Sequence, residues 1–170
     1  MYFEGLTPKL FRASKKVTQR NCVFLYGPTR SGKTTVLKAI ENYLSVQGGV
    51  KVIRLDAEDL VIELVKGIRC AGDTKGFYHK FHDYDALLVD NVWVLQGKPR
   101  TTEEIFLLFG TLIDKGKLLI IAWDILPATL SRGSKGVMEL HKRSIIVKMK
   151  PLKSNINIGS GTLNRKYLKK

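Results

Sequence analysis

Residues 22–35 read CVFLYGPTRSGKTT, and this stretch predicts the fold around it. Residues 22–26 form an uninterrupted apolar run that ends at Gly27 and Pro28, as is typical of a buried β-strand. From Lys33 to about Val46, apolar residues recur at helical spacing, and a pair of glycines then ends the pattern. A strand, a glycine-containing loop and a helix therefore follow one another directly, which is a typical beginning of an α/β fold.

Residues 27–34 match the P-loop pattern G-x-x-x-x-G-K-[ST] in full, between the predicted strand and the predicted helix. In such a loop the glycines let backbone N–H groups point at phosphate oxygens, and the helix N-terminus adds positive potential. Lys33 then reaches the β- and γ-phosphates, and the Thr34 hydroxyl ligates Mg²⁺. The pattern predicts binding of ATP or ADP with Mg²⁺; a glycine turn with an incidental lysine is the alternative. The residues predicted to contact the nucleotide are Gly27, Pro28, Thr29, Arg30, Ser31, Gly32, Lys33, Thr34 and Thr35.

Further apolar runs predict strands at residues 50–55, 86–90, 117–123 and 144–149. Helices are predicted from an N-cap at Asp56 to about Arg69, over a short segment ending near His82, and over residues 101–115. A capping-box pattern in residues 101–104 opens the last of these helices. Strands that alternate with helices in this way predict a three-layer α/β sandwich with a five-stranded parallel sheet. The apolar residues expected on one side of the helix after Asp56 are Leu60, Val61, Leu64, Val65 and Ile68.

An acid stands at the end of the third predicted strand, where Asp90 follows residues 86–89. P-loop NTPases use such an acid to hold the Mg²⁺ shell, so Thr34 and Asp90 are the expected metal residues. The next residue, Asn91, can orient a water molecule but cannot take its proton at neutral pH. The sequence therefore predicts nucleotide binding together with weak hydrolysis.

The net charge of +14 is spread unevenly along the 170 residues. Residues 1–20 hold five basic residues and one acid, and residues 131–170 hold eleven basic residues and one acid. The stretch between them, 21–130, holds 13 residues of each sign. A neutral body with two basic ends indicates an anionic partner, most often nucleic acid, with solubility charge as the alternative.

Several function classes are disfavoured by the remaining composition. The longest uncharged apolar stretch, residues 105–113, is too short to span a bilayer, and the first residues lack a signal-peptide core. Cys22 and Cys70 make no disulfide framework, which favours a reducing, cytoplasmic location. His79, His82 and His141 lack acidic or cysteine partners at metal-ligand spacing. We interpret Trp93 and Trp123 as core or interface aromatics.

From residue 21 to about residue 127 the sequence resembles the AAA+ module of the bacterial replication initiator DnaA and its short regulator or loader paralogues. The match rests on FLYG at 24–27, on YDALLVDN at 84–91 and on LQGKPRTTEEIF at 95–106. Asp124 and Pro127 stand where this family has an Asp and a Pro after the fourth strand, in the sensor 1 region. The resemblance implies a parallel sheet of the AAA+ type.

Roles for individual residues follow from this resemblance. The family's counterparts of Val65, Lys98 and Arg100 contact single-stranded DNA in a channel between assembled subunits; a core valine and two solvated cations are the alternatives. The counterpart of Arg143 is an arginine finger that reaches the γ-phosphate held by a neighbouring subunit, whereas an ordinary charge of the basic tail is the alternative. The expected catalytic residues are Asp90, Asn91, Asp124 and Arg143.

The sequence also departs from the family pattern. Ala122 and Trp123 replace the Ser or Thr expected before the sensor Asp, and the residues after Pro151 are too few for a complete helical lid. The duplex-reading domain of the initiators is also not expected. The expected layout is a basic leading helix at 1–20, a nucleotide-binding core at 21–150 and a basic tail at 151–170.

Three functions are compatible with this reading. The first is an ATP- or ADP-dependent adaptor or loader that engages a replication initiator or helicase-type protein and hydrolyses ATP weakly. The second is an ATPase that assembles on single-stranded DNA, with Arg143 acting on a neighbour and Asn91 orienting water. The third is a pseudo-ATPase whose basic ends bind nucleic acid. A P-loop nucleotide kinase is disfavoured because no acceptor-binding or lid segment is evident.

Overall fold

The computed structural model describes residues 21–46, 48–124 and 135–150. The elements in chain order are β1 (Cys22–Tyr26), α2 (Lys33–Val46), β2 (Val52–Asp56), α3 (Ala57–Ala71), α4 (Lys75–His82), β3 (Ala86–Asp90), the 3₁₀ helix η1 (Val92–Leu95), α5 (Pro99–Asp114), β4 (Leu118–Trp123), α7 (Lys135–Arg143) and β5 (Ile145–Lys148). The leading helix at 1–20, Pro127 and the tail at 151–170 lie outside the described residues. Within the described ranges, no helix is long and apolar enough to cross a membrane.

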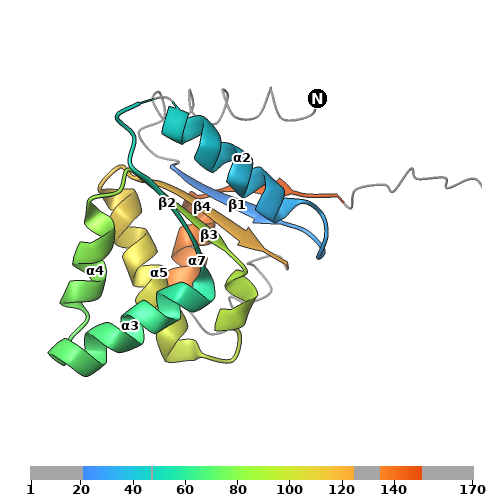
Figure 1. Ribbon diagram of the computed structural model, residues 1–170. Helices are drawn as coiled ribbons and strands as arrows, with labels where there is room; N and C mark the ends of the chain where they lie inside the picture. The colour runs from blue at the N-terminus through green and yellow to red at the C-terminus, as the bar shows by residue number, and fades with distance from the viewer. Residues whose placement is uncertain (1–20, 47, 125–134, 151–170) are drawn as a thin grey trace, which may run out of the picture.

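The five strands form one parallel sheet in the order β2-β3-β4-β1-β5. β1 lies between β4 and β5, where Phe24 is in register with Ile121 on one side and Ile146 on the other. Figure 1 shows α2 on one face of the sheet and α3, α5 and α7 on the opposite face. The predicted three-layer α/β sandwich with a five-stranded parallel sheet is therefore confirmed.

Successive side chains of β1 pack on opposite faces of the sheet, as the geometry of a strand requires. Val23 and Leu25 pack with the buried face of α2, while Cys22 and Phe24 pack on the side of α3 and α5. Apolar partners on both faces explain why this strand reads as a continuous apolar run. The α2 residues expected to face the core are all buried: Val36, Leu37, Ile40 and Leu44. This packing fixes α2, and with it the loop between β1 and α2.

The buried side of α3 is narrower than the sequence predicts. Leu64 is buried, but Val65 is 37% exposed and Ile68 is 46% exposed. One turn after Leu64, the packed line continues through Gly67, where an added Cβ would lie 3.6 Å from the Cβ of Phe77 in α4. Because α4 covers that side of α3, Val65 and Ile68 lie beside the contact and remain accessible.

The N-terminus of α5 also differs from the prediction. The helix begins at Pro99, two residues before the expected start, and proline suits this position because its missing N–H would have no helical partner there. The Thr102 hydroxyl donates to the carbonyl oxygens of Leu95, at 3.0 Å, and Lys98, at 2.8 Å. Thr102 therefore lies inside the first turn, and the predicted capping box at 101–104 is wrong. The short helix η1 and the helix α7 were not predicted.

Candidate functional site

A cleft of about 470 Å³ opens where β1, β3 and β4 end, at the carboxyl edge of the sheet. This is the edge at which open α/β sheets bind their ligands. The lining residues come from the loop after β1, the start of α2, the segment after β3 and the end of β4. They are Thr29, Arg30, Gly32, Lys33, Thr34, Thr35, Asp90, Asn91, Trp93 and Asp124. All except Trp93 are residues that the sequence assigns to the nucleotide or to catalysis, so the fold brings those predictions together.

Trp93 also lines the cleft, although the sequence did not assign it to the nucleotide or to catalysis. The turn of η1 buries Val92 and Leu95 and leaves Trp93 51% exposed. Trp123, in contrast, is buried, with its ring 6.4 Å from that of Phe24 between centroids. Of the two positions interpreted for these residues, core or interface, the core position holds for Trp123 and is excluded for Trp93, for which an interface position stays a prediction. The short apolar run at 92–95 gave no signal of a 3₁₀ turn that would rotate Trp93 outward.

The loop between β1 and α2 takes the shape that its residues permit. Gly32 has a φ of 86° and Arg30 a φ of 64°, so both lie in the left-handed region. The backbone N–H of Ser31 donates to the carbonyl of Pro28 at 3.1 Å and closes the turn. Gly27 serves another purpose, because an added Cβ would lie 2.4 Å from the carbonyl oxygen of Met149. Close approach of the chain after β5 requires glycine at position 27.

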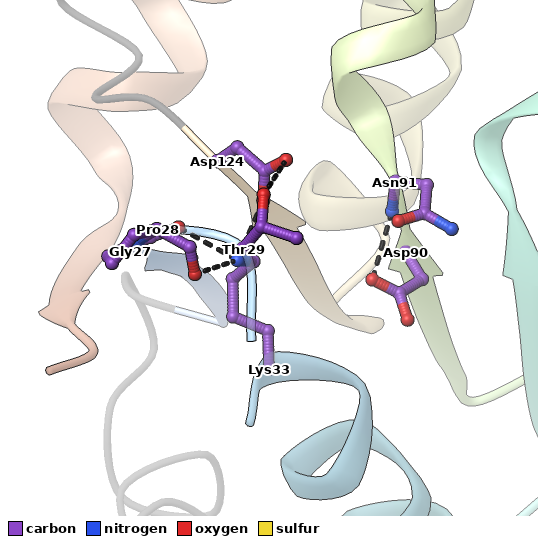
Figure 2. A network of polar contacts seen from close by, with 7 residues as sticks. All are labelled: Gly27, Pro28, Thr29, Lys33, Asp90, Asn91 and Asp124. Atoms are coloured by element: carbon purple, nitrogen blue, oxygen red, sulfur yellow. Dashed lines mark hydrogen bonds and ion pairs between the residues drawn. The ribbon is translucent and has the colours of Figure 1, made fainter. Parts of the chain in front are cut away.

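The Lys33 side chain is buried at the centre of the site, and its ammonium group has three oxygen partners (Figure 2). Its Nζ donates to the carbonyl oxygens of Gly27, at 2.7 Å, and Pro28, at 3.0 Å, and pairs with Asp124 Oδ1 at 2.7 Å. Thr29 Oγ1 lies 3.5 Å from the other oxygen of Asp124. An ammonium group has three donors, so this arrangement satisfies Lys33 and joins the loop to the end of β4.

Asp90 and Asn91 form a second polar group across the cleft, at the end of β3. Asp90 is buried, and its Oδ1 accepts the backbone N–H of Asn91 at 2.9 Å. Asn91 has a φ of 53°, a left-handed conformation that asparagine tolerates better than most residues. Its Nδ2 donates to Asp56 Oδ1 at 2.7 Å, and Asp56 is in register with Asp90 on the adjacent strand β2. The sequence reading treated Asp56 only as a helix cap and missed this contact.

The oxygen chemistry of the cleft fits a nucleotide with a magnesium ion. The Thr34 hydroxyl and the Asp90 carboxylate line the same cleft, and oxygen donors of this kind are what Mg²⁺ prefers. The buried Oγ of Ser31 has no hydrogen-bond partner in the described part of the chain. Buried polar atoms normally have a partner, so this hydroxyl is available to hydrogen-bond a group bound in the loop. Among the described residues, no group of three or more His, Cys, Asp or Glu side chains could hold a metal by itself.

Arg143 lies outside this cleft. It ends α7, and its guanidinium pairs with Asp114 of α5 at 2.6 Å. Both residues line a separate hollow of about 450 Å³ between α5 and α7. The predicted arginine finger therefore does not reach the P-loop of its own chain, and it belongs to the folded body rather than to the tail.

The three residues predicted to contact DNA all lie on the outer surface. Val65 is partly exposed on α3, so the alternative of an ordinary core valine is wrong. Lys98 and Arg100 are exposed at the beginning of α5, just after η1. Because α3 contacts both η1 and α5, these residues come from elements that pack against one another.

Comparison with known proteins gives consistent results. The sequence pattern described as the bacterial DnaA ATPase domain matches residues 9–147. The chromosomal replication initiator protein DnaA 2 of Protochlamydia amoebophila is 35% identical over 149 residues, which cover 88% of this chain and 32% of that protein. DnaA of Rickettsia bellii is 35% identical over 119 residues, covering 69% of this chain and 26% of that protein. The chain thus spans between a quarter and a third of the length of these curated relatives.

Solved structures show the same relationship. AMPPCP-bound DnaA from Aquifex aeolicus superposes with a TM-score of 0.71 at 29% identity, covering 84% of this chain and 45% of that chain. Domain III of Thermotoga maritima DnaA superposes with a TM-score of 0.73 at 27% identity, covering 85% and 60%. A DnaA structure with AMPPCP and single-stranded DNA gives a TM-score of 0.71 at 30% identity, covering 83% and 44%.

Proposed function

The chain belongs to the family of bacterial DnaA ATPase domains, and on that premise we propose that it is a nucleotide-dependent adaptor or loader in the initiation of DNA replication. It binds ATP or ADP in the cleft at the ends of β1, β3 and β4. The observation that carries the proposal is the convergence of a complete P-loop with Asp90 and Asp124 around one cleft. The AMPPCP-bound DnaA of similar fold supports this assignment.

In this proposal each residue of the cleft has one task. Loop N–H groups and the N-terminus of α2 face the phosphates, and Lys33 supplies positive charge to them. Thr34 and Asp90 hold Mg²⁺, which neutralises phosphate charge when it is bound. Asp124 orients Lys33 through their 2.7 Å ion pair. Asn91 orients water without accepting its proton, so ATP is hydrolysed slowly and the bound state persists.

The proposed partners are a replication initiator or helicase-type protein and single-stranded DNA. Val65, Lys98 and Arg100 offer an exposed apolar residue and two exposed cations, a combination that suits nucleic-acid bases and a phosphate backbone. A DnaA structure of similar fold contains single-stranded DNA, which supports this role. The core at 21–150 binds the nucleotide, and the basic segments 1–20 and 151–170 add salt-sensitive attraction to the anionic partner.

Titration with a fluorescent ATP analogue in the presence of Mg²⁺ tests nucleotide binding. Lys33→Ala removes the buried ammonium, and we expect a loss of affinity of about tenfold or more, as for a charged hydrogen bond to phosphate. Lys38→Ala is the matched control, because Lys38 is an exposed lysine of the same helix. Equal, weak binding by the wild-type protein and Lys33→Ala, with both folded by circular dichroism, would overturn the proposal.

A second function, an ATPase that assembles on single-stranded DNA, is favoured by the position of Arg143 outside its own cleft. Because Arg143 lies outside its own cleft, it would act only on a γ-phosphate held by another subunit, so turnover should rise with protein concentration. Turnover is measured with and without single-stranded DNA for the wild type, Arg143→Ala and the neighbouring control Lys142→Ala. Loss in Arg143→Ala alone supports this function, whereas turnover independent of concentration argues against it. DNA affinity that is identical in all nucleotide states would instead support a pseudo-ATPase.

A further inference from the structure

Asp56 is a carboxylate next to the cleft whose position calls for an explanation. It ends β2, in register with Asp90 of β3, and it occupies the N-cap position of α3. An Asp at an N-cap normally accepts a hydrogen bond from a backbone N–H of the first helical turn. Asp56 makes no such bond. Its Oδ1 instead accepts the side-chain amide of Asn91 at 2.7 Å.

This hydrogen bond determines how the Asn91 amide is turned. A carboxylate accepts hydrogen bonds and does not donate them, so only Nδ2 of Asn91 can face Asp56. Figure 2 shows this nitrogen on the side away from Lys33. Asn91 lines the cleft, and its Oδ1 is the end of the amide left for groups within the cleft. The left-handed backbone of Asn91 is braced at the same time by the bond from its N–H to Asp90.

We infer that Asp56 is a positioning residue for ATP hydrolysis, acting by holding the Asn91 amide with its oxygen toward the attacking water. The inference rests on the proposed nucleotide binding. An amide oxygen accepts a hydrogen from water and leaves a lone pair of the water oxygen free to approach phosphorus. The opposite orientation would have Nδ2 donate to that lone pair and oppose the attack.

The bond changes in this step are those of an ordinary phosphoryl transfer to water. The water oxygen bonds to the γ-phosphorus, and the bond from that phosphorus to the β–γ bridging oxygen breaks. The electron pair stays on the leaving ADP, and the water proton passes to an oxygen of the departing phosphate. Neither Asn91 nor Asp56 takes the proton, so the step proceeds without a general base and is slow.

The hydrogen bond between Asp56 and Asn91 also explains why a single substitution at position 91 does not create an efficient general base for the attacking water. Asn91→Asp would place a second carboxylate next to Asp56 with no hydrogen between them, and the repulsion of two like charges would turn the new side chain away from the position that Asn91 occupies. Exchanging the two side chains keeps one amide, one carboxylate and their hydrogen bond, and it moves the carboxylate into the cleft. The exchange therefore separates the contribution that the hydrogen-bonded pair makes to the rate of ATP hydrolysis from the contribution of each residue alone.

The test compares wild type, Asp56→Ala, Asn91→Asp and the double variant Asp56→Asn/Asn91→Asp in single-turnover hydrolysis of labelled ATP by excess protein. Asp59→Ala is the control, because Asp59 is an exposed acid in the first turn of the same helix. We expect Asp56→Ala to slow hydrolysis several-fold with unchanged ATP affinity, and Asp59→Ala to have no effect. The double variant should exceed the wild type by about a hundredfold, the lower range of a general-base contribution.

The split between ATP affinity and hydrolysis rate distinguishes positioning from a structural role. A positioning residue changes the rate and leaves ATP affinity unchanged, whereas a structural role would change both. Recovery of a fast rate only when both side chains are exchanged shows that the Asp56–Asn91 hydrogen bond acts as a unit. Equal rates for wild type and Asp56→Ala, or a double variant no faster than Asn91→Asp, would overturn the inference. ATP affinity is measured separately for each variant, so a wild type that binds no ATP refutes the proposed function instead.

Discussion

The cleft and the outer surface of this protein differ in what holds their functional residues in place. In the cleft, Lys33 is buried and has three oxygen partners from two parts of the chain, and Asp90 is buried beneath Asn91. On the outer surface, Val65 is accessible on α3, and Arg143 forms an ion pair with the exposed carboxylate of Asp114. The cleft is organised by the fold itself, whereas the roles proposed for the outer residues require a second molecule.

The largest expected effect on the free energy of unfolding concerns Leu64 and Val65, two neighbouring residues of α3 of which the first is buried and the second is partly exposed. Leu64→Ala empties a buried site and should lower the free energy of unfolding by about 2–5 kcal/mol. Val65→Ala removes a partly exposed side chain and should change it by less than about 1 kcal/mol. Urea unfolding measures both. Similar losses for the two variants would show that Val65 belongs to the core and would count against its proposed contact with DNA.

A smaller effect is expected at the loop that forms the cleft. Gly27→Ala places a Cβ within 2.4 Å of the Met149 carbonyl oxygen, so the chain after β5 must shift at a cost of about 1–3 kcal/mol. Gly110→Ala is the matched control, because a Cβ at this position in α5 meets nothing within 4 Å and alanine favours a helix. Thermal unfolding followed by circular dichroism should show a lower midpoint only for Gly27→Ala. An unchanged midpoint would mean that the two segments do not approach closely.

The smallest perturbation is chemical modification of the two cysteine thiols. The rate of modification reports how buried each thiol is, and no residue has to be substituted. Cys22 is buried in β1, and desolvation raises the pKa of its thiol to about 12, so almost no thiolate forms at pH 8. Cys70 is exposed on α3. Treatment of the folded protein with a thiol reagent at pH 8 should therefore modify Cys70 quickly and Cys22 only after unfolding. Rapid modification of both thiols would indicate that β1 opens readily.

Much of the cleft could be predicted from sequence because its information is local. Residues 27–34 are consecutive, and the position of Asp90 follows from its place at the end of an apolar run. The bond between Asn91 and Asp56 spans 35 positions in the sequence and depends on the register of β2 with β3. No local pattern encodes that register. The ion pair of Lys33 with Asp124 depends in the same way on β4 lying next to β1.

The errors in the prediction have a related cause. The residues at 101–104 match a capping box, but Pro99 begins α5 earlier and places Thr102 within the first turn. Val65 and Ile68 fit an apolar stripe, but α4 determines which side of α3 is covered. In both cases a local preference was real, and a neighbouring residue or element outweighed it.

By itself, the sequence determined the class of fold and the chemistry of the cleft. Apolar runs alternating with helical patterns require a covered parallel sheet, and the P-loop pattern specifies a backbone shaped for phosphate. The tertiary structure decided which side chains from different strands meet and which remain outside. It placed Asp56 on Asn91, and it kept Arg143 away from its own cleft. The physical reason is that helix and turn preferences act over a few residues, whereas strand order and packing join segments that are distant in the chain.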